Sequence, residues 1–201
     1  MTAPAAGFAC RHQPFTLPEP IAVELTAAYG EPQRAYHNMA HIAELLRWFD
    51  TVDTDVGWQH PADVYTAILF HDAIYVPGAK DNEARSAEWA RRSGLPADLT
   101  RVGELIELTA QHGKLVSAIG DTALFLDSDM AIVASPTPAY LEYAQRIRRE
   151  YAAVPADAYR AGRRAFLASV AAKPRIFFSD YFHDRLDAQA RHNLATELAG
   201  L

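Results

Sequence analysis

One stretch of the sequence limits the fold more than any other, because residues 64–76 are apolar on every face of a helix and yet contain His71-Asp72. A helix that is apolar all round is buried in a core. Aspartate is rarely buried without a partner, since an isolated carboxylate loses its hydration there. The stretch therefore predicts a central helix whose acid is paired with arginine or with a divalent cation, for which imidazole nitrogen and carboxylate oxygen are suitable ligands.

The rest of the chain is also typical of helices. It is rich in alanine and leucine, has few alternating β-branched residues, and carries proline or glycine at helix-length intervals. We predict an all-α fold. Its helices are expected over about residues 19–29, 37–51, 61–75, 81–93, 97–112, 122–134, 137–152, 156–172 and 180–199.

Length and composition favour one domain. The chain has 201 residues, 50% of them hydrophobic, so we predict a single domain over residues 18–201 after an N-terminal extension over residues 1–17. The single cysteine, Cys10, excludes an intramolecular disulfide and favours a cytoplasmic location. The first ten residues do not resemble a secretory signal, and no run approaches the roughly 18 apolar residues of a membrane helix.

The charge of the chain limits its partners. The net charge is −6 with histidine neutral, and the lysines and arginines are dispersed. Duplex nucleic acid is held mainly by clustered cations, so strong nucleic-acid binding is not expected, and neither is a membrane partner. A small phosphorylated substrate needs only one or two arginines and stays compatible with this charge. The sequence leaves a homodimer open.

Two histidines precede the central segment. His37 and His41 are four residues apart, about one helical turn, so on a helix both imidazoles share one face. Such a pair can chelate one metal ion, or one histidine can bind the metal while the other transfers protons.

A second apolar stretch, residues 123–126, leads into Asp127 and Asp129. On a helix, Asp129 shares its face with larger apolar side chains than Asp127 does. We therefore expect Asp129 to be the more deeply buried acid and the better metal ligand. Asp127 either orients a ligand histidine or starts the turn.

The chain resembles the HD superfamily of metal-dependent phosphohydrolases, whose ordered signature is matched by His41, His71-Asp72 and Asp129. The resemblance implies an HD-type helical bundle in which these four side chains hold one or two divalent ions, of Mn, Fe, Co, Ni, Zn or Mg. It implies hydrolysis of a phosphoester of a nucleotide or small phosphorylated metabolite, with metal-activated water as the nucleophile. Asp72 would bridge the two ions if both are present.

Two branches of that superfamily are similar to different stretches. Tyr36-His37-Asn38 is similar to the cyclic-nucleotide phosphodiesterases, which implies that His37 protonates the leaving oxygen. That branch is longer and has a further histidine where this chain has Tyr75, which argues against cyclic-nucleotide hydrolysis. The chain more closely resembles small bacterial HD proteins described as predicted metal-dependent phosphohydrolases. That likeness covers about residues 18–198 and includes residues 81–83 and 159–163.

Further residues beside these motifs have a functional and a structural interpretation. Arg34 and Lys80 are candidates for phosphate binding. Glu83 either serves the site or stabilises the start of a helix, and His112 either binds a second metal or substrate or stabilises a helix C-terminus.

The residues that flank His37 have similar alternatives. Tyr36 is expected to line the pocket. Asn38 either hydrogen-bonds a metal-bound water or helps to start the helix.

Two other functions stay open at this point. An HD-fold di-iron oxygenase needs additional ligands, which His112 together with Glu83 or His37 could supply. A non-catalytic metal-binding protein needs only the ligands themselves. The fold class alone does not decide among them.

Overall fold

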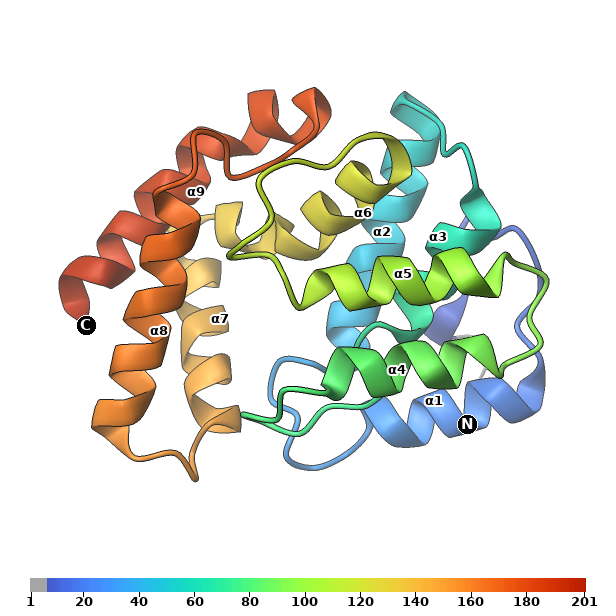
Figure 1. The fold of residues 1–201 in the computed structure, drawn as a ribbon, viewed down its shortest axis with the longest axis horizontal. Helices are drawn as coiled ribbons and strands as arrows, with labels where there is room; N and C mark the ends of the chain where they lie inside the picture. Colours follow the sequence, from blue (N-terminus) through green and yellow to red (C-terminus); the bar gives the residue numbers. More distant parts are fainter. Residues whose placement is uncertain (1–6) are drawn as a thin grey trace. The chain divides into compact units, whose positions relative to one another are not determined.

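The computed structural model describes residues 7–201, and within them every element of regular secondary structure is a helix (Figure 1). This confirms the predicted all-α class. The chain divides into two compact units, one ending at Ala110 and one running over Gln111–Leu201. The proposed single domain over residues 18–201 stays a prediction.

The first unit is built around α3. Its helices are α1 (Glu19–Tyr29), α2 (Met39–Asp55), α3 (Pro61–Phe70), α4 (Asn82–Arg91) and α5 (Leu99–Thr109). Every residue from Asp63 to Phe70 is buried, and α3 packs against α2, α4 and α5. The apolar segment is therefore a central helix, as its composition predicts. Helices α4 and α5 lie side by side over it (Figure 1).

Residues 7–17 pack against the first unit. Phe8 is fully buried, and its carbonyl accepts a hydrogen bond from the Tyr65 hydroxyl at 2.7 Å. The amides of Arg11 and His12 donate to the Asp50 carboxylate at 2.9 and 2.8 Å. This part of the predicted extension is thus held on α2 and α3, whereas residues 1–6 of it lie outside the described residues.

The second unit surrounds α9. It contains α6 (Gly120–Met130), a 3-10 turn over Ala131–Ala134, α7 (Thr137–Glu150), α8 (Ala156–Ala171) and α9 (Asp180–Gly200). Helix α9 packs against the other four elements. Inside the unit, Arg163 of α8 is buried and pairs with Glu197 of α9 at 2.8 Å.

Two helices near the candidate ligands have bounds that differ from the predicted ones. The helix expected over residues 37–51 begins at Met39, because Asn38 is its N-cap. The helix expected over residues 61–75 ends at Phe70, and residues 71–76 form a turn. The first difference places His37 in a turn before α2, and the second places His71 and Asp72 in the turn after α3.

No helix in the described part of the chain combines the length and the apolar character that crossing a bilayer requires.

Candidate metal centre

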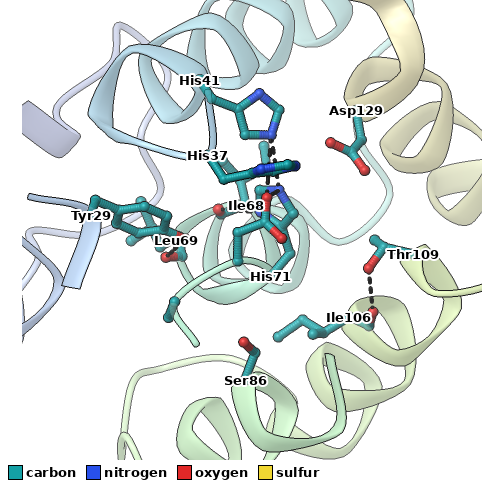
Figure 2. A network of polar contacts seen from close by, with 12 residues as sticks. Tyr29, His37, His41, Ile68, Leu69, His71, Ser86, Ile106, Thr109 and Asp129 are labelled. Carbon is teal, nitrogen blue, oxygen red and sulfur yellow. Dashed lines mark hydrogen bonds and ion pairs between the residues drawn. The ribbon is translucent and has the colours of Figure 1, made fainter. Parts of the chain in front are cut away.

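Three side chains of the first unit converge at the junction of α2 and α3. His41 Nε2 lies 3.1 Å from His71 Nε2 (Figure 2). His71 Nε2 lies 3.0 Å from Asp72 Oδ2. The remaining distance, from His41 Nε2 to Asp72 Oδ2, is 3.6 Å. Ligands that share one ion at bond lengths of about 2.1 Å lie roughly 3 Å apart. The three groups therefore form a cluster that can hold a metal ion.

The cluster is largely shielded from water. His41 is 3% exposed and His71 is 1% exposed, while the Asp72 side chain keeps 16% of its surface. Burial opposes the charged form of Asp72, but the imidazoles of His71, His37 and His41 outweigh that effect and hold the pKa of the carboxyl well below its usual range. Asp72 is therefore an anion that faces imidazole rings.

The hydrogen bond at the other ring nitrogen selects the tautomer of His71. Its Nδ1 lies 3.0 Å from the carbonyl oxygen of Ile68, one turn back in α3 (Figure 2). A carbonyl can only accept, so Nδ1 carries the proton and the lone pair of a neutral ring is on Nε2. That lone pair is on the atom that faces His41 and Asp72. A backbone carbonyl on the distal nitrogen is the usual support of a metal-binding histidine.

The donor set suits a divalent cation. Two imidazole nitrogens and one carboxylate oxygen are ligands of Zn²⁺ and of the neighbouring transition metals. The guanidinium of Arg34 donates to the main-chain oxygen of Asp72 at 2.6 Å, while the Asp72 carboxylate faces the imidazoles of His41 and His71. The residues present therefore fit a bound metal ion.

Local sequence explains how His41 is directed inward. Asn38 Oδ1 accepts from the Ala40 amide at 2.9 Å, and Asn38 Nδ2 donates to the carbonyls of Arg34 and Ala35 at 3.3 and 3.2 Å. Asn38 thereby starts α2, which agrees with its structural interpretation. His41 is the third residue of the helix and faces the core.

His37 does not share a helical face with His41, so the argument from their spacing is wrong. His37 precedes the cap residue and lies in a turn. Its ring centroid is still only 6.0 Å from that of His41, 5.0 Å from Tyr36 and 4.1 Å from Tyr75. Tyr36 and Tyr75 are both buried. The structure thus places His37 beside the cluster, between two tyrosines.

Arg34 occupies a different position from the one expected of a phosphate ligand. Its side chain is 1% exposed and bonds to Glu31 through Nε at 2.9 Å. Its terminal nitrogens donate to the carbonyls of His37, Asp72 and Ala73 at 3.1, 2.6 and 2.9 Å. All three guanidinium nitrogens therefore bond to protein acceptors, which leaves Arg34 poorly placed to bind phosphate.

Lys80 and Glu83 lie at the start of α4. Lys80 is exposed in the turn that precedes the helix, and Glu83 is half-buried in its first turn. That place agrees with the interpretation of Glu83 as a stabiliser of the helix N-terminus. The role of Lys80 in phosphate binding stays a prediction.

The remaining candidates belong to the second unit. His112 lies in a turn after α5, and its Nε2 is 2.8 Å from Asp129 Oδ2. Asp129 as a fourth ligand and His112 as a second-metal ligand stay predictions of the sequence resemblance.

The expected order of burial of the two acids of α6 is wrong. Asp127 is 1% exposed, whereas the Asp129 side chain is 15% exposed. The Asp127 carboxylate accepts from the amides of Phe178 and Ser179 at 2.8 Å each and from the Ser179 hydroxyl at 2.6 Å. It therefore bonds to the segment that leads into α9, and not to a ligand histidine.

Sequence reasoning missed two polar residues that contact the turn of residues 71–76. Asn82 and Ser86 of α4 are buried and hydrogen-bond to Val76 and Ile74. The signal that could have found them is the small polar side chain on the apolar face of α4, next to Ala87 and Ala90.

Comparison with known proteins adds no relative. Searches among protein-family models, curated proteins and solved structures found no match to this chain.

Proposed function

We propose that the chain is a metal-dependent phosphohydrolase of the HD type. The observation that carries the proposal is the convergence of His41 Nε2, His71 Nε2 and Asp72 Oδ2 within 3.0 to 3.6 Å, with both histidines buried. A buried anion beside two imidazoles gains most from a cation placed among them. The order of these residues in the chain is the order of the HD signature.

His41, His71 and Asp72 would hold the metal ion. A divalent ion bound there supplies Lewis acidity, which lowers the pKa of water and neutralises charge on a phosphoryl oxygen. The mixed nitrogen and oxygen donors favour Mn²⁺, Fe²⁺, Co²⁺, Ni²⁺ or Zn²⁺ over Mg²⁺ at this position. Asp72 has a second carboxylate oxygen, which is the group that would serve a second ion.

His37 would act as the general acid. Its ring lies beside the cluster but is not part of it, which is where a proton donor to the leaving oxygen is needed. The rings of Tyr36 and Tyr75 pack against it and restrict its orientation. Histidine can donate a proton near neutral pH.

The substrate would be a small phosphoester. The acidic net charge argues against a long polyanion, and the ligand cluster leaves only part of the Asp72 side chain open to solvent. A nucleotide or another phosphorylated metabolite meets these limits.

A screen of metals against substrates tests the proposal. The purified protein is stripped of metal, reloaded with each of the six ions, and assayed for phosphate or pyrophosphate release from mono-, di- and triphosphorylated nucleotides and metabolites. Asp72→Ala is the negative control. We expect metal-dependent release that this variant lacks. Oxygen consumption that requires iron would favour an oxygenase over a hydrolase. Metal binding without turnover of any substrate in the panel would favour a non-catalytic metal-binding protein.

A further inference from the structure

In the turn of residues 71–76 after α3, side chains from other segments bond to the main chain of four residues. Helix α3 ends at Phe70, so the carbonyls that follow have no helical partner. Side chains from two other segments bond to the main chain of Asp72, Ala73, Ile74 and Val76. These hydrogen bonds fix the conformation of an irregular turn next to the candidate metal ligands.

Arg34 connects the two segments that carry the proposed chemistry. One terminal nitrogen donates both to the carbonyl of His37 and to that of Asp72, and the other donates to Ala73. The guanidinium also lies over the rings of Tyr29 and Tyr75, with its central carbon 5.3 and 5.6 Å from their centroids. A rigid planar fork with several bonds positions its acceptors far better than a single flexible donor does.

Asn82 and Ser86 hold the other end of the turn. Asn82 accepts from the Val76 amide and donates to the Val76 carbonyl, both at 3.0 Å. Ser86 Oγ accepts from the Ile74 amide at 3.0 Å and lies 3.4 Å from the Ile74 carbonyl. Tyr75 lies between these two fixed peptide groups, and its ring packs on His37 at a centroid distance of 4.1 Å.

We propose that Arg34, Asn82 and Ser86 are positioning residues, which hold the turn of residues 71–76 so that Asp72 meets the two histidines and Tyr75 supports His37. The inference rests on the metal site of the proposed function. All three side chains bond to main-chain atoms of this turn. Partners of this kind typically change metal affinity about 10- to 100-fold.

Cobalt binding tests the proposal without an assay of turnover. Co²⁺ is titrated into metal-free wild type, Arg34→Met, Arg34→Lys, Asn82→Ala and Ser86→Ala, with calorimetry for affinity and visible absorption for ligand geometry. We expect Arg34→Met to weaken Co²⁺ binding about 10- to 100-fold and to alter the spectrum. Arg34→Lys should recover part of the loss, and Ser86→Ala should lose up to about tenfold.

Two matched variants separate positioning from general loss of stability. Thr66→Val removes a fully buried hydroxyl of α3 that bonds only within its helix, to Ala62 at 2.8 Å. Arg163→Met removes the buried arginine of the second unit. Both should lower the melting temperature of the metal-free protein and leave its affinity and spectrum for Co²⁺ unchanged.

The outcomes distinguish this inference from the proposed function. Unchanged Co²⁺ affinity and spectrum in folded Arg34→Met, or in Ser86→Ala and Asn82→Ala if the former does not fold, would overturn it. Equal losses in the two matched variants would also overturn it. A wild type that binds Co²⁺ but hydrolyses nothing ends the hydrolase proposal alone, and one that binds no Co²⁺ ends both.

Discussion

In each unit of the molecule one aspartate interrupts an apolar stretch near a helix end, and these two carboxylates have opposite surroundings. Asp72 of the first unit faces imidazoles, which lower the pKa of its carboxyl. Asp127 of the second unit faces two amides and a hydroxyl, and burial raises the pKa of its carboxyl to about 6 in spite of these hydrogen bonds. The pattern of apolar residues with an embedded acid is the same in both.

The comparison shows how to distinguish a structural acid from a candidate ligand. Both oxygens of the Asp127 carboxylate accept hydrogen bonds from main-chain amides, so the protein itself satisfies this buried acid. The Asp72 carboxylate has partners that can either donate protons or coordinate metal with the same nitrogen atoms. The imidazole surroundings, and not burial alone, distinguish the cluster that could hold a metal ion.

The largest expected effect is on metal binding by Asp72→Ala. Loss of an anionic ligand should exceed the 10- to 100-fold effect of residues that only support one, so we expect affinity for Mn²⁺ or Zn²⁺ to fall at least about 100-fold. Turnover should be abolished with it. Calorimetry and metal content after purification measure the change.

Asp63→Asn is the matched control for that change. Asp63 is a buried carboxylate of the same unit, and it accepts from the Asp98 amide at 2.8 Å. The variant should lose stability but keep its metal. If Asp72→Ala retains full metal occupancy, Asp72 is not a metal ligand, and the distinction between Asp72 and the structural acid Asp127 is wrong.

The second effect is on the rate of reaction in His37→Ala. Removal of a general acid typically lowers kcat roughly 10²- to 10⁴-fold. Because His37 lies outside the cluster, metal affinity should change less than about threefold. Stopped assays at saturating metal measure kcat, and His60→Ala, which removes a histidine next to Arg101, is the control. A parallel loss of metal in His37→Ala would make it a ligand.

The third effect is on stability in Asp127→Ala. Three hydrogen bonds disappear and buried donors lose their acceptor, which should cost about 2 to 3 kcal/mol. Urea denaturation measures the loss, and faster hydrogen exchange of the Phe178 and Ser179 amides locates it. Asp127→Asn keeps one acceptor oxygen and should lose less. A change below about 0.5 kcal/mol would mean that the carboxylate does not hold this segment.

The features that the sequence predicts correctly are those that depend on local patterns of residue types. The apolar run that ends in His71-Asp72 identified a central helix, and the residue types within it identified the candidate ligands. The preference of asparagine for N-caps was sufficient to start α2 at Met39, which would have placed His37 outside the helix. That boundary could have been predicted more sharply from the sequence.

The rest depends on contacts between distant residues. Near the end of helix α3, Tyr29 donates to the carbonyl of Leu69 from 40 positions earlier in the chain (Figure 2). Arg34 bonds in the same way to the carbonyls of Asp72 and Ala73, which are 38 and 39 positions later. Asp127 is buried by contact with a segment 51 residues later. Helical periodicity describes one helix at a time and contains no information on such partners.

The smallest effect concerns pH and Asp187, a second structural acid of the second unit. Its carboxylate accepts from the Ile176 amide at 2.7 Å and from Arg191 at 2.6 Å, and these bonds outweigh burial and lower its pKa below the usual 3.8. A lowered pKa in the folded state adds stability that is present above the unfolded pKa and is lost as pH falls through the folded pKa. Asp187→Asn should therefore cost about 1 to 2 kcal/mol at neutral pH, and this cost should shrink as pH falls below 3.8. The pKa of Asp127 is raised, so its titration has the opposite effect: the pH-dependent stability that it adds in acid is lost as pH rises through about 6. Urea midpoints measured from pH 3 to 7 should fall towards acid less steeply in Asp187→Asn than in wild type, and parallel curves would assign the acid sensitivity to other groups.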